Sequence, residues 1–70
     1  MTVYVLLRED QNEHGYIDTS ITGVYRDLRL AKEQEASERL SARGQGLLVE
    51  DDERDPDWQV SWKLEEHFVD

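Results

Sequence analysis

The segment WQVSWKLEE (58–66) alternates apolar and polar residues, and this alternation constrains the fold more than any other feature of the chain. Successive side chains of a β-strand point to opposite faces of a sheet, so such a segment buries one face and leaves the other in water. The apolar residues that share its buried face are Trp58, Val60, Trp62 and Leu64. The pattern therefore predicts a half-buried strand, and with it a sheet that has one solvated side.

Two further segments near the N-terminus predict strands. TVYVLLRE (2–9) is rich in β-branched and aromatic residues and is apolar on both faces, which is typical of a central strand or of one whose second face is covered. YIDTSITGVY (16–25) is also typical of a strand, and Gly23 within it indicates a bulge or a close backbone approach. The polar segment 10–15 between the two ends in glycine and predicts a hairpin connection.

RDLRLAKEQEASERLSARG (26–44) predicts the one helix. Asp27 is the expected N-cap, because its carboxylate can accept a hydrogen bond from a free backbone N–H of the first turn. Glu35 and Arg39 have the favourable i, i+4 order, and Gly44 is expected in the left-handed position just past the helix end. Its apolar residues are scattered, so we expect the helix to rest on the sheet through a narrow stripe of small residues.

The element order predicts an α+β fold. QGLLVE (45–50) is expected to be a short strand or extended segment, and Pro56 excludes regular ladder pairing in the loop that follows. The order β-β-α-β-β is most simply a two-layer domain, an antiparallel sheet of three to four strands with one helix across it. The 70 residues form a single domain, 1–70, whose core supplies only about 3–5 kcal/mol of stability.

The net charge of −9 narrows the classes of partner. It argues against direct binding to nucleic acid or to an anionic membrane, because both select basic surfaces. With no cysteine, the chain has neither a disulfide nor a thiolate metal site. No apolar run reaches the length of a membrane span, and the N-terminus lacks the pattern of a signal peptide, so a cytoplasmic protein is expected.

The acidic excess is concentrated, since residues 44–70 hold nine of the 17 acids and two of the 8 bases. Six carboxylates stand within eight positions: Glu50, Asp51, Asp52, Glu53, Asp55 and Asp57. A calcium loop starting at Asp51 would need glycine at its sixth place and glutamate at its twelfth, where this chain has Pro56 and Trp62. The run therefore predicts a charged binding surface rather than a specific metal site.

Nothing in the sequence has the pattern of a catalytic site. His14 and His67 have no partner at zinc-ligand spacing, and no serine lies in a nucleophile elbow. Gly44 and Gly46 lack the lysine and the hydroxyl residue of a phosphate loop. We expect a protein that is not an enzyme and that uses no cofactor.

The spacing of the acids suggests nucleic-acid mimicry. An extended chain advances about 3.3 Å per residue, and one strand of duplex DNA presents a phosphate about every 3.4 Å. The acidic run thus approaches the charge density of a nucleic-acid strand, although Arg54 interrupts it. Three acids of the first loop region would extend the patch if the fold brings them close: Glu9, Asp10 and Glu13.

Aromatic residues leave a second interpretation open. Trp58 and Trp62 are predicted to be core, because large aromatics dominate the energetics of small domains, but tryptophan is also enriched in interface hot spots. Tyr4, Tyr16 and Tyr25 would either cover a second sheet face or contact a twin subunit.

The stretch YVLLREDQNEHGYIDTSITGVYRDLRLA (4–31) resembles a loose group of small bacterial and phage proteins of unknown function, in which a strand ends in Gly-Val-Tyr or Gly-Val-Phe before a helix with alanine near its start. Gly23, Val24, Tyr25 and Ala31 carry the resemblance. In size and acidity the chain is also similar to phage-encoded inhibitors of host defence, the anti-CRISPR and anti-restriction proteins, some of which mimic nucleic acid. This second similarity implies a basic protein surface as the partner.

Two functional hypotheses follow. In the first, the chain is a phage-type inhibitor that occupies a basic nucleic-acid-binding surface of a host protein by presenting carboxylates in place of phosphates. In the second, it is a small homo-oligomeric adaptor that binds through an apolar sheet face including Tyr4 or Leu6, and its acidity serves solubility.

Overall fold

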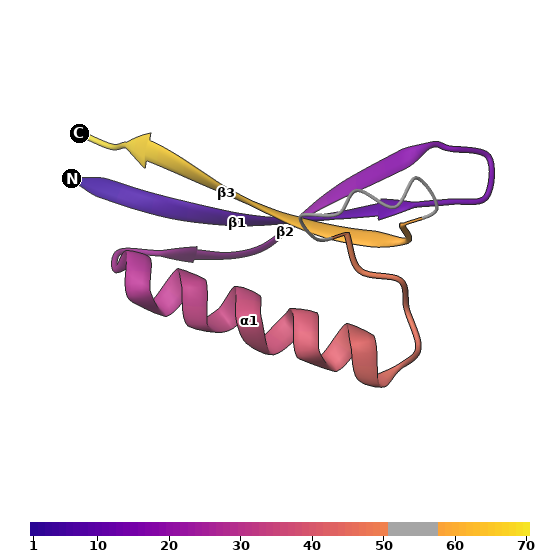
Figure 1. Ribbon diagram of the computed structural model, residues 1–70. Helices are drawn as coiled ribbons and strands as arrows, with labels where there is room; N and C mark the ends of the chain where they lie inside the picture. The colour runs from indigo at the N-terminus through magenta and orange to yellow at the C-terminus, as the bar shows by residue number, and fades with distance from the viewer. Residues whose placement is uncertain (51–57) are drawn as a thin grey trace.

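The computed structural model, in which residues 1–50 and 58–70 are described, is a three-stranded antiparallel sheet with one helix across it (Figure 1). The elements are β1 (Thr2–Gln11), β2 (Ile17–Tyr25), α1 (Leu28–Gly44) and β3 (Val60–Phe68). The sheet order is β2-β1-β3, so the first strand is central, as its two apolar faces indicate. The predicted α+β class and the antiparallel sheet are confirmed.

The segment 45–50, expected to be a short strand or an extended segment, makes one bridge, a parallel contact of Val49 with Val60. The Leu48 carbonyl also accepts from the N–H groups of Gln59 and Val60. The Leu47 N–H donates to the Ala42 carbonyl at the helix end, and the Glu50 carbonyl accepts from the Arg39 side chain. The order among the described elements is therefore β-β-α-β, because the segment pairs only with residues 59 and 60 at the start of β3.

The core lies between α1 and one face of the sheet, which we call the covered face. It is formed by Leu6, Ala42, Val60 and Trp62, all at most 5% exposed. Leu6 is paired with Leu64 across β1 and β3, and Arg8 with Trp62, so the predicted apolar face is confirmed from Val60 onward. Ser61, predicted on the solvated face, is only 8% exposed. Tyr25, Leu47, Val49 and Leu64 pack around this core and are partly buried. Trp58 is only half-buried and precedes β3.

Gly23 lies where the register of β1 and β2 shifts. Leu6 pairs with Gly23 and Leu7 with Ile21, so Thr22 is the extra residue of a bulge. A Cβ placed on Gly23 would lie 2.6 Å from the Tyr25 hydroxyl oxygen. The predicted bulge is confirmed, and glycine is needed there because the tyrosine ring lies against its backbone.

Helix α1 begins with the expected cap and ends differently from expectation. The Arg29 N–H donates to Asp27 Oδ1 at 2.9 Å. At the other end it is Gly46, with φ +82°, that takes the left-handed position predicted for Gly44. The Leu47 N–H reaches back to the Ala42 carbonyl at 3.0 Å, so the helix runs to Gly44 and ends in a Schellman motif. Only Ala31 and Ala42 of α1 are buried, which confirms the narrow stripe.

The opposite face of the sheet, which we call the open face, carries no helix (Figure 1). Its apolar residues come from the central strand and from β2: Val3, Val5, Leu7, Ile17, Ile21 and Val24. Tyr4 and Leu6 lie instead on the covered face, and Leu6 is 0% exposed. The adaptor hypothesis had placed Tyr4 or Leu6 on the apolar face that binds a partner. The residues of β1 that lie on the open face are instead the odd-numbered ones.

Candidate functional site

The predicted acidic surface is only partly within the described residues. Of the six carboxylates, Glu50 is described. The other five lie outside the described residues: Asp51, Asp52, Glu53, Asp55 and Asp57. Arg54 lies outside them too. The two described residues that flank this segment are Glu50 and Trp58. The geometry of the site is therefore the geometry of these two flanks and of the residues that hold them.

Glu50 is fixed on both sides through its backbone. Its N–H donates to the Val60 carbonyl at 2.9 Å, which ties it to the first residue of β3. Its carbonyl accepts from Nη1 of Arg39 at 2.8 Å, which ties it to α1. The start of the acidic segment is thus bonded to both layers of the fold.

Trp58 is held at the same end of the sheet. Its carbonyl accepts from Nε2 of Gln11, the last residue of β1, at 3.0 Å. Gln59, the next residue, donates its N–H to the Leu48 carbonyl at 2.8 Å and accepts from the Gln11 N–H at 2.9 Å. The residue that follows the segment is therefore held at the end of β1, where the β1–β2 hairpin begins, away from the chain termini (Figure 1).

The three acids expected to extend the patch are close in sequence but point differently. Glu9 lies on the open face, paired with Ser61, and Asp10 lies on the covered face, paired with Val60. The Glu13 side chain is in the hairpin, 88% exposed and 3.7 Å from His14. Asp10 is opposite Asp18 of β2, and its carboxylate is bonded to Arg8 at 3.0 Å. Glu13 is thus the one of the three with a freely exposed carboxylate.

Sequence reasoning missed a basic seam beside Glu50. The Arg8 and Arg39 guanidinium carbons lie 5.6 Å and 5.4 Å from the centre of the Trp62 ring, within cation–π range. Arg39 also lies 3.9 Å from Glu35, the predicted i, i+4 pair. The helical period could have indicated this contact. Arg39 is one turn from Glu35 and one turn from Ala42, which places it on the side of the helix that faces the sheet.

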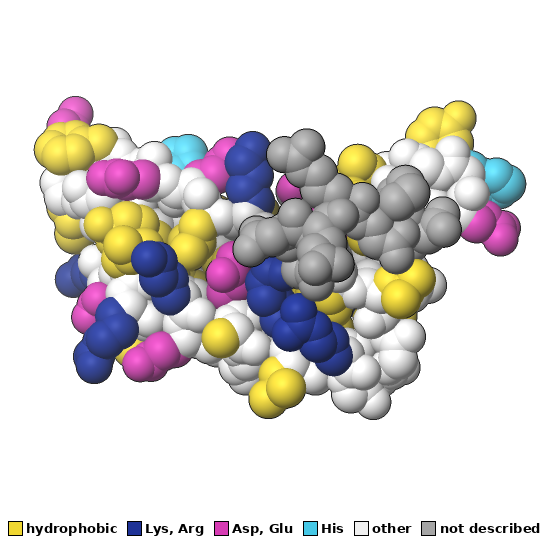
Figure 2. All heavy atoms as spheres, viewed as in Figure 1, with side chains coloured by type: hydrophobic (Ala, Val, Ile, Leu, Met, Phe, Trp, Pro, Cys, Tyr) yellow, Lys and Arg dark blue, Asp and Glu magenta, His cyan; other side chains and the backbone are white. Residues whose placement is uncertain are grey.

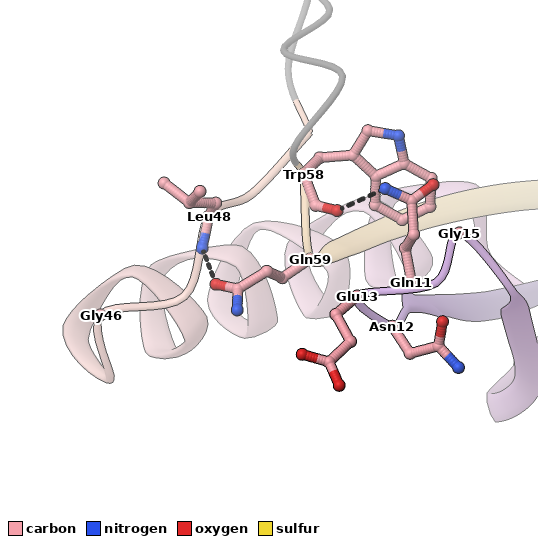
Figure 3. A pocket seen from close by; sticks show the side chains of 8 residues that line it. All are labelled: Gln11, Asn12, Glu13, Gly15, Gly46, Leu48, Trp58 and Gln59. Carbon is pink, nitrogen blue, oxygen red and sulfur yellow. Dashed lines mark hydrogen bonds between the residues drawn. The ribbon is translucent and has the colours of Figure 1, made fainter.

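A hollow of about 680 Å³ opens beside Trp58, between the hairpin and the segment after α1 (Figure 3). Its lining is largely amide and glycine: Gln11, Asn12, Glu13, Gly15, Gly46, Leu48, Trp58 and Gln59. Gln59 Oε1 accepts from the Leu48 N–H at 2.9 Å, and Asn12 Oδ1 accepts from two hairpin N–H groups. The Glu13 carboxylate points away from both of the amide contacts drawn in Figure 3. The hollow is therefore a polar recess with one aromatic wall and one acidic side chain.

The described surface outside this region has mixed charge. In Figure 2 acidic and basic side chains are interspersed on the face viewed, with hydrophobic side chains between them. Within residues 1–50 and 58–70 no three histidine or acidic side chains gather closely enough to hold a metal ion. Helix α1, the only helix of the described chain, is too polar to cross a bilayer.

The fold and this surface define a small α+β protein with a mixed-charge body and an acidic segment anchored at one end of the sheet. No protein-family model, no curated protein and no solved structure matches the chain.

Proposed function

We propose that this is a non-enzymatic binding protein that occupies a basic, nucleic-acid-binding surface of another protein, with carboxylates standing in for phosphates. The binding residues would be the six acids of 50–57 together with Glu13. An inhibitor of this kind would act in the cytoplasm, where a phage-encoded chain would meet the nucleic-acid-handling defence proteins of its host.

The anchoring of the acidic segment is the observation that carries the proposal. Glu50 and Trp58 are each hydrogen-bonded to other elements of the fold, so a run that holds most of the net charge starts and ends on fixed backbone. Residues 50 and 58 are thus fixed before any partner binds, so their ordering adds no entropy cost to binding.

Charge distribution supports a protein partner rather than a nucleic acid. The helix region 26–43 has nearly balanced charge, with five bases and four acids, so the acidic field arises mainly from the other parts of the chain. A concentrated field steers a basic surface toward it and makes association fast and salt-dependent. The recess beside Trp58 would receive an arginine or lysine side chain of the partner, because an indole ring and a carboxylate both attract cations.

Competitive release tests mimicry directly. The chain is immobilised, proteins are captured from a lysate of its host, and the column is developed with duplex DNA and then with RNA. Mimicry expects that nucleic acid releases the captured protein at a salt concentration where a neutral polymer does not. Capture that nucleic acid fails to reverse would contradict the proposal.

A matched pair of variants locates the surface. The triple variant Asp51→Asn, Asp52→Asn, Asp55→Asn is expected to lose capture, because it removes three charges from the run while keeping the side-chain shapes. The control Glu33→Gln, Glu66→Gln, Asp70→Asn removes the same charge from exposed positions elsewhere and should retain capture. Equal loss in both variants would show that total charge alone is recognised.

A further inference from the structure

The open face is the largest part of the sheet that the described chain leaves in water. On it Ile21 is 66% exposed, Val24 58% and Ile17 48%. Val3, Val5 and Leu7 of the central strand lie beside them and are only half-buried. Leu7 pairs with Ile21 and Val5 with Val24, so two neighbouring strands present an apolar patch of the kind that marks an interaction site. Ile17 lies apart from this patch, beyond the Glu9–Thr19 pair.

The open-face rows of β1 and β2 carry a single charged side chain, Glu9, although the chain carries −9. The charged side chains that share the open face lie at its margin, on β3 and at the end of β1. On β3, Glu65 lies 3.9 Å from Lys63 and 3.3 Å from His67, so these groups are already paired with each other. Asp18, the one acid of β2, is on the covered face opposite Asp10. The cross-strand pairs Leu7–Ile21 and Val5–Val24 thus form an uncharged patch on which two acidic molecules can meet, with Glu9 at its edge.

The chain exposes more surface than a compact domain of its size, and it is elongated. Its accessible surface is 5250 Å², whereas a folded monomeric protein of 8.3 kDa exposes about 4,600 Å². Its radius of gyration is 12.9 Å, against about 11 Å for a compact domain of this length. The excess surface of about 700 Å² is close to the 800 Å² or so that each partner contributes to a standard interface.

We infer that a second copy of this chain covers the open face, so that two sheets pack face to face with their helices outside. The apolar rows of β1 and β2 form the dry centre of this interface, and the paired β3 groups form its rim. Aligned sheets pack about 10 Å apart, a spacing that valine, leucine and isoleucine side chains fill.

A second copy fits this face better than an unlike partner does. A basic partner is drawn to the acidic end of the molecule, since charge selects opposite charge and the apolar rows offer none. A two-fold interface needs only a self-complementary patch, and an uncharged aliphatic surface complements itself.

Sedimentation equilibrium of the full chain, from micromolar to millimolar concentration, tests the inference. The wild type is expected to reach twice 8.3 kDa. Ile21→Lys places an ammonium group at the centre of the interface in each copy, and we expect it to raise the dissociation constant of the dimer more than about 100-fold. The matched control is Leu40→Lys on α1, where the original leucine is 72% exposed compared with 66% for Ile21; this variant should remain a dimer.

Several outcomes would overturn the inference. A wild type that keeps the mass of one chain at millimolar concentration excludes it, as does a dimer that survives Ile21→Lys but is lost in Leu40→Lys. Loss of the dimer in both variants excludes it as well, because the face would then not be specific. Circular dichroism establishes that each variant is folded; should Ile21→Lys unfold, Val24→Lys at a 58% exposed position replaces it.

Salt separates this inference from the proposed function. Two chains of like charge repel, so screening is expected to tighten the dimer as sodium chloride rises from 0.05 M to 0.5 M or so. Capture of a basic partner should weaken over the same range. Ile21→Lys leaves every carboxylate in place, so a monomeric variant that still captures its partner would support both proposals independently.

Discussion

The two faces of the sheet are built from the same strands and from similar residues, yet one is core and the other is surface. Leu6 is 0% exposed on the covered face, whereas Ile21 on the open face is 66% exposed. Both are aliphatic and both lie on strands of one ladder. The comparison teaches that hydrophobicity alone does not choose the core of a chain this small; the choice depends on which face the single helix can approach.

Side-chain size explains the choice of face. The helix presents Ala31 and Ala42 to the sheet, and β2 contributes Gly23, which leaves room for the Tyr25 ring beneath α1. Trp62 then fills the space between the layers, with Arg8 and Arg39 over its ring. The open face has no comparable set of small residues, and its branched side chains suit a flat partner such as another sheet.

The largest expected effect comes from adjacent residues on opposite faces. Leu6→Ala removes a fully buried side chain and should cost about 2–5 kcal/mol of unfolding free energy, which exhausts most of the stability of so small a domain. Leu7→Ala, on the open face, should cost about 1 kcal/mol or less in the monomer. Urea unfolding at micromolar concentration measures both, and equal losses would break the comparison.

Alanine substitutions at two glycines are expected to change the free energy of unfolding in opposite directions. Gly23→Ala places a methyl group against the Tyr25 ring and should destabilise the fold by about 1–3 kcal/mol. Gly44→Ala meets nothing within 4 Å and lies within α1, so it should stabilise by up to about 1 kcal/mol. Thermal melts of the two variants are compared; a stabilising Gly23→Ala would mean that the covered face is less tightly packed than described.

The smallest effect concerns the basic seam of the covered face. Arg39→Lys keeps the charge but loses the planar group over Trp62 and its bond to the Glu50 carbonyl, which should cost about 1–2 kcal/mol. Arg29→Lys is the control, because that side chain is 74% exposed and its only ion pair within the described residues spans 4.0 Å. Hydrogen exchange at the Glu50 N–H should quicken in the first variant alone. An unchanged exchange rate would show that the helix does not hold this end of the acidic segment.

Much of the fold could be predicted because local patterns and local geometry agree. The apolar face of the last strand from Val60, the bulge at Gly23 and the cap at Asp27 each depend on a few neighbouring residues, and each is present. Two details could not be predicted, because they depend on residues distant in the sequence or on where the helix ends. The left-handed residue is Gly46 because the helix continues through Gly44, and 45–50 makes a single bridge because distant groups hold its backbone.

Some properties of the candidate site could likewise be predicted from the sequence, and others could not. Its charge, its carboxylate spacing and its freedom from cysteine are properties of the chain itself. The contact of Trp58 with the end of β1 and the Arg39 contact with Glu50 required the tertiary structure. The opposite directions of Glu9 and Asp10 follow from the period of a strand. Residues 47 positions apart, as Gln11 and Trp58 are, meet only when the sheet forms.

From its sequence alone, this protein has a strong acidic charge, strands with an apolar and a polar side, and one helix with a stripe of small residues. These properties follow from residue type and period, which any window of the chain carries. Tertiary structure alone decided which apolar face became the core and which stayed open, because a single helix can bury one side of a sheet and no local pattern records the side on which it packs.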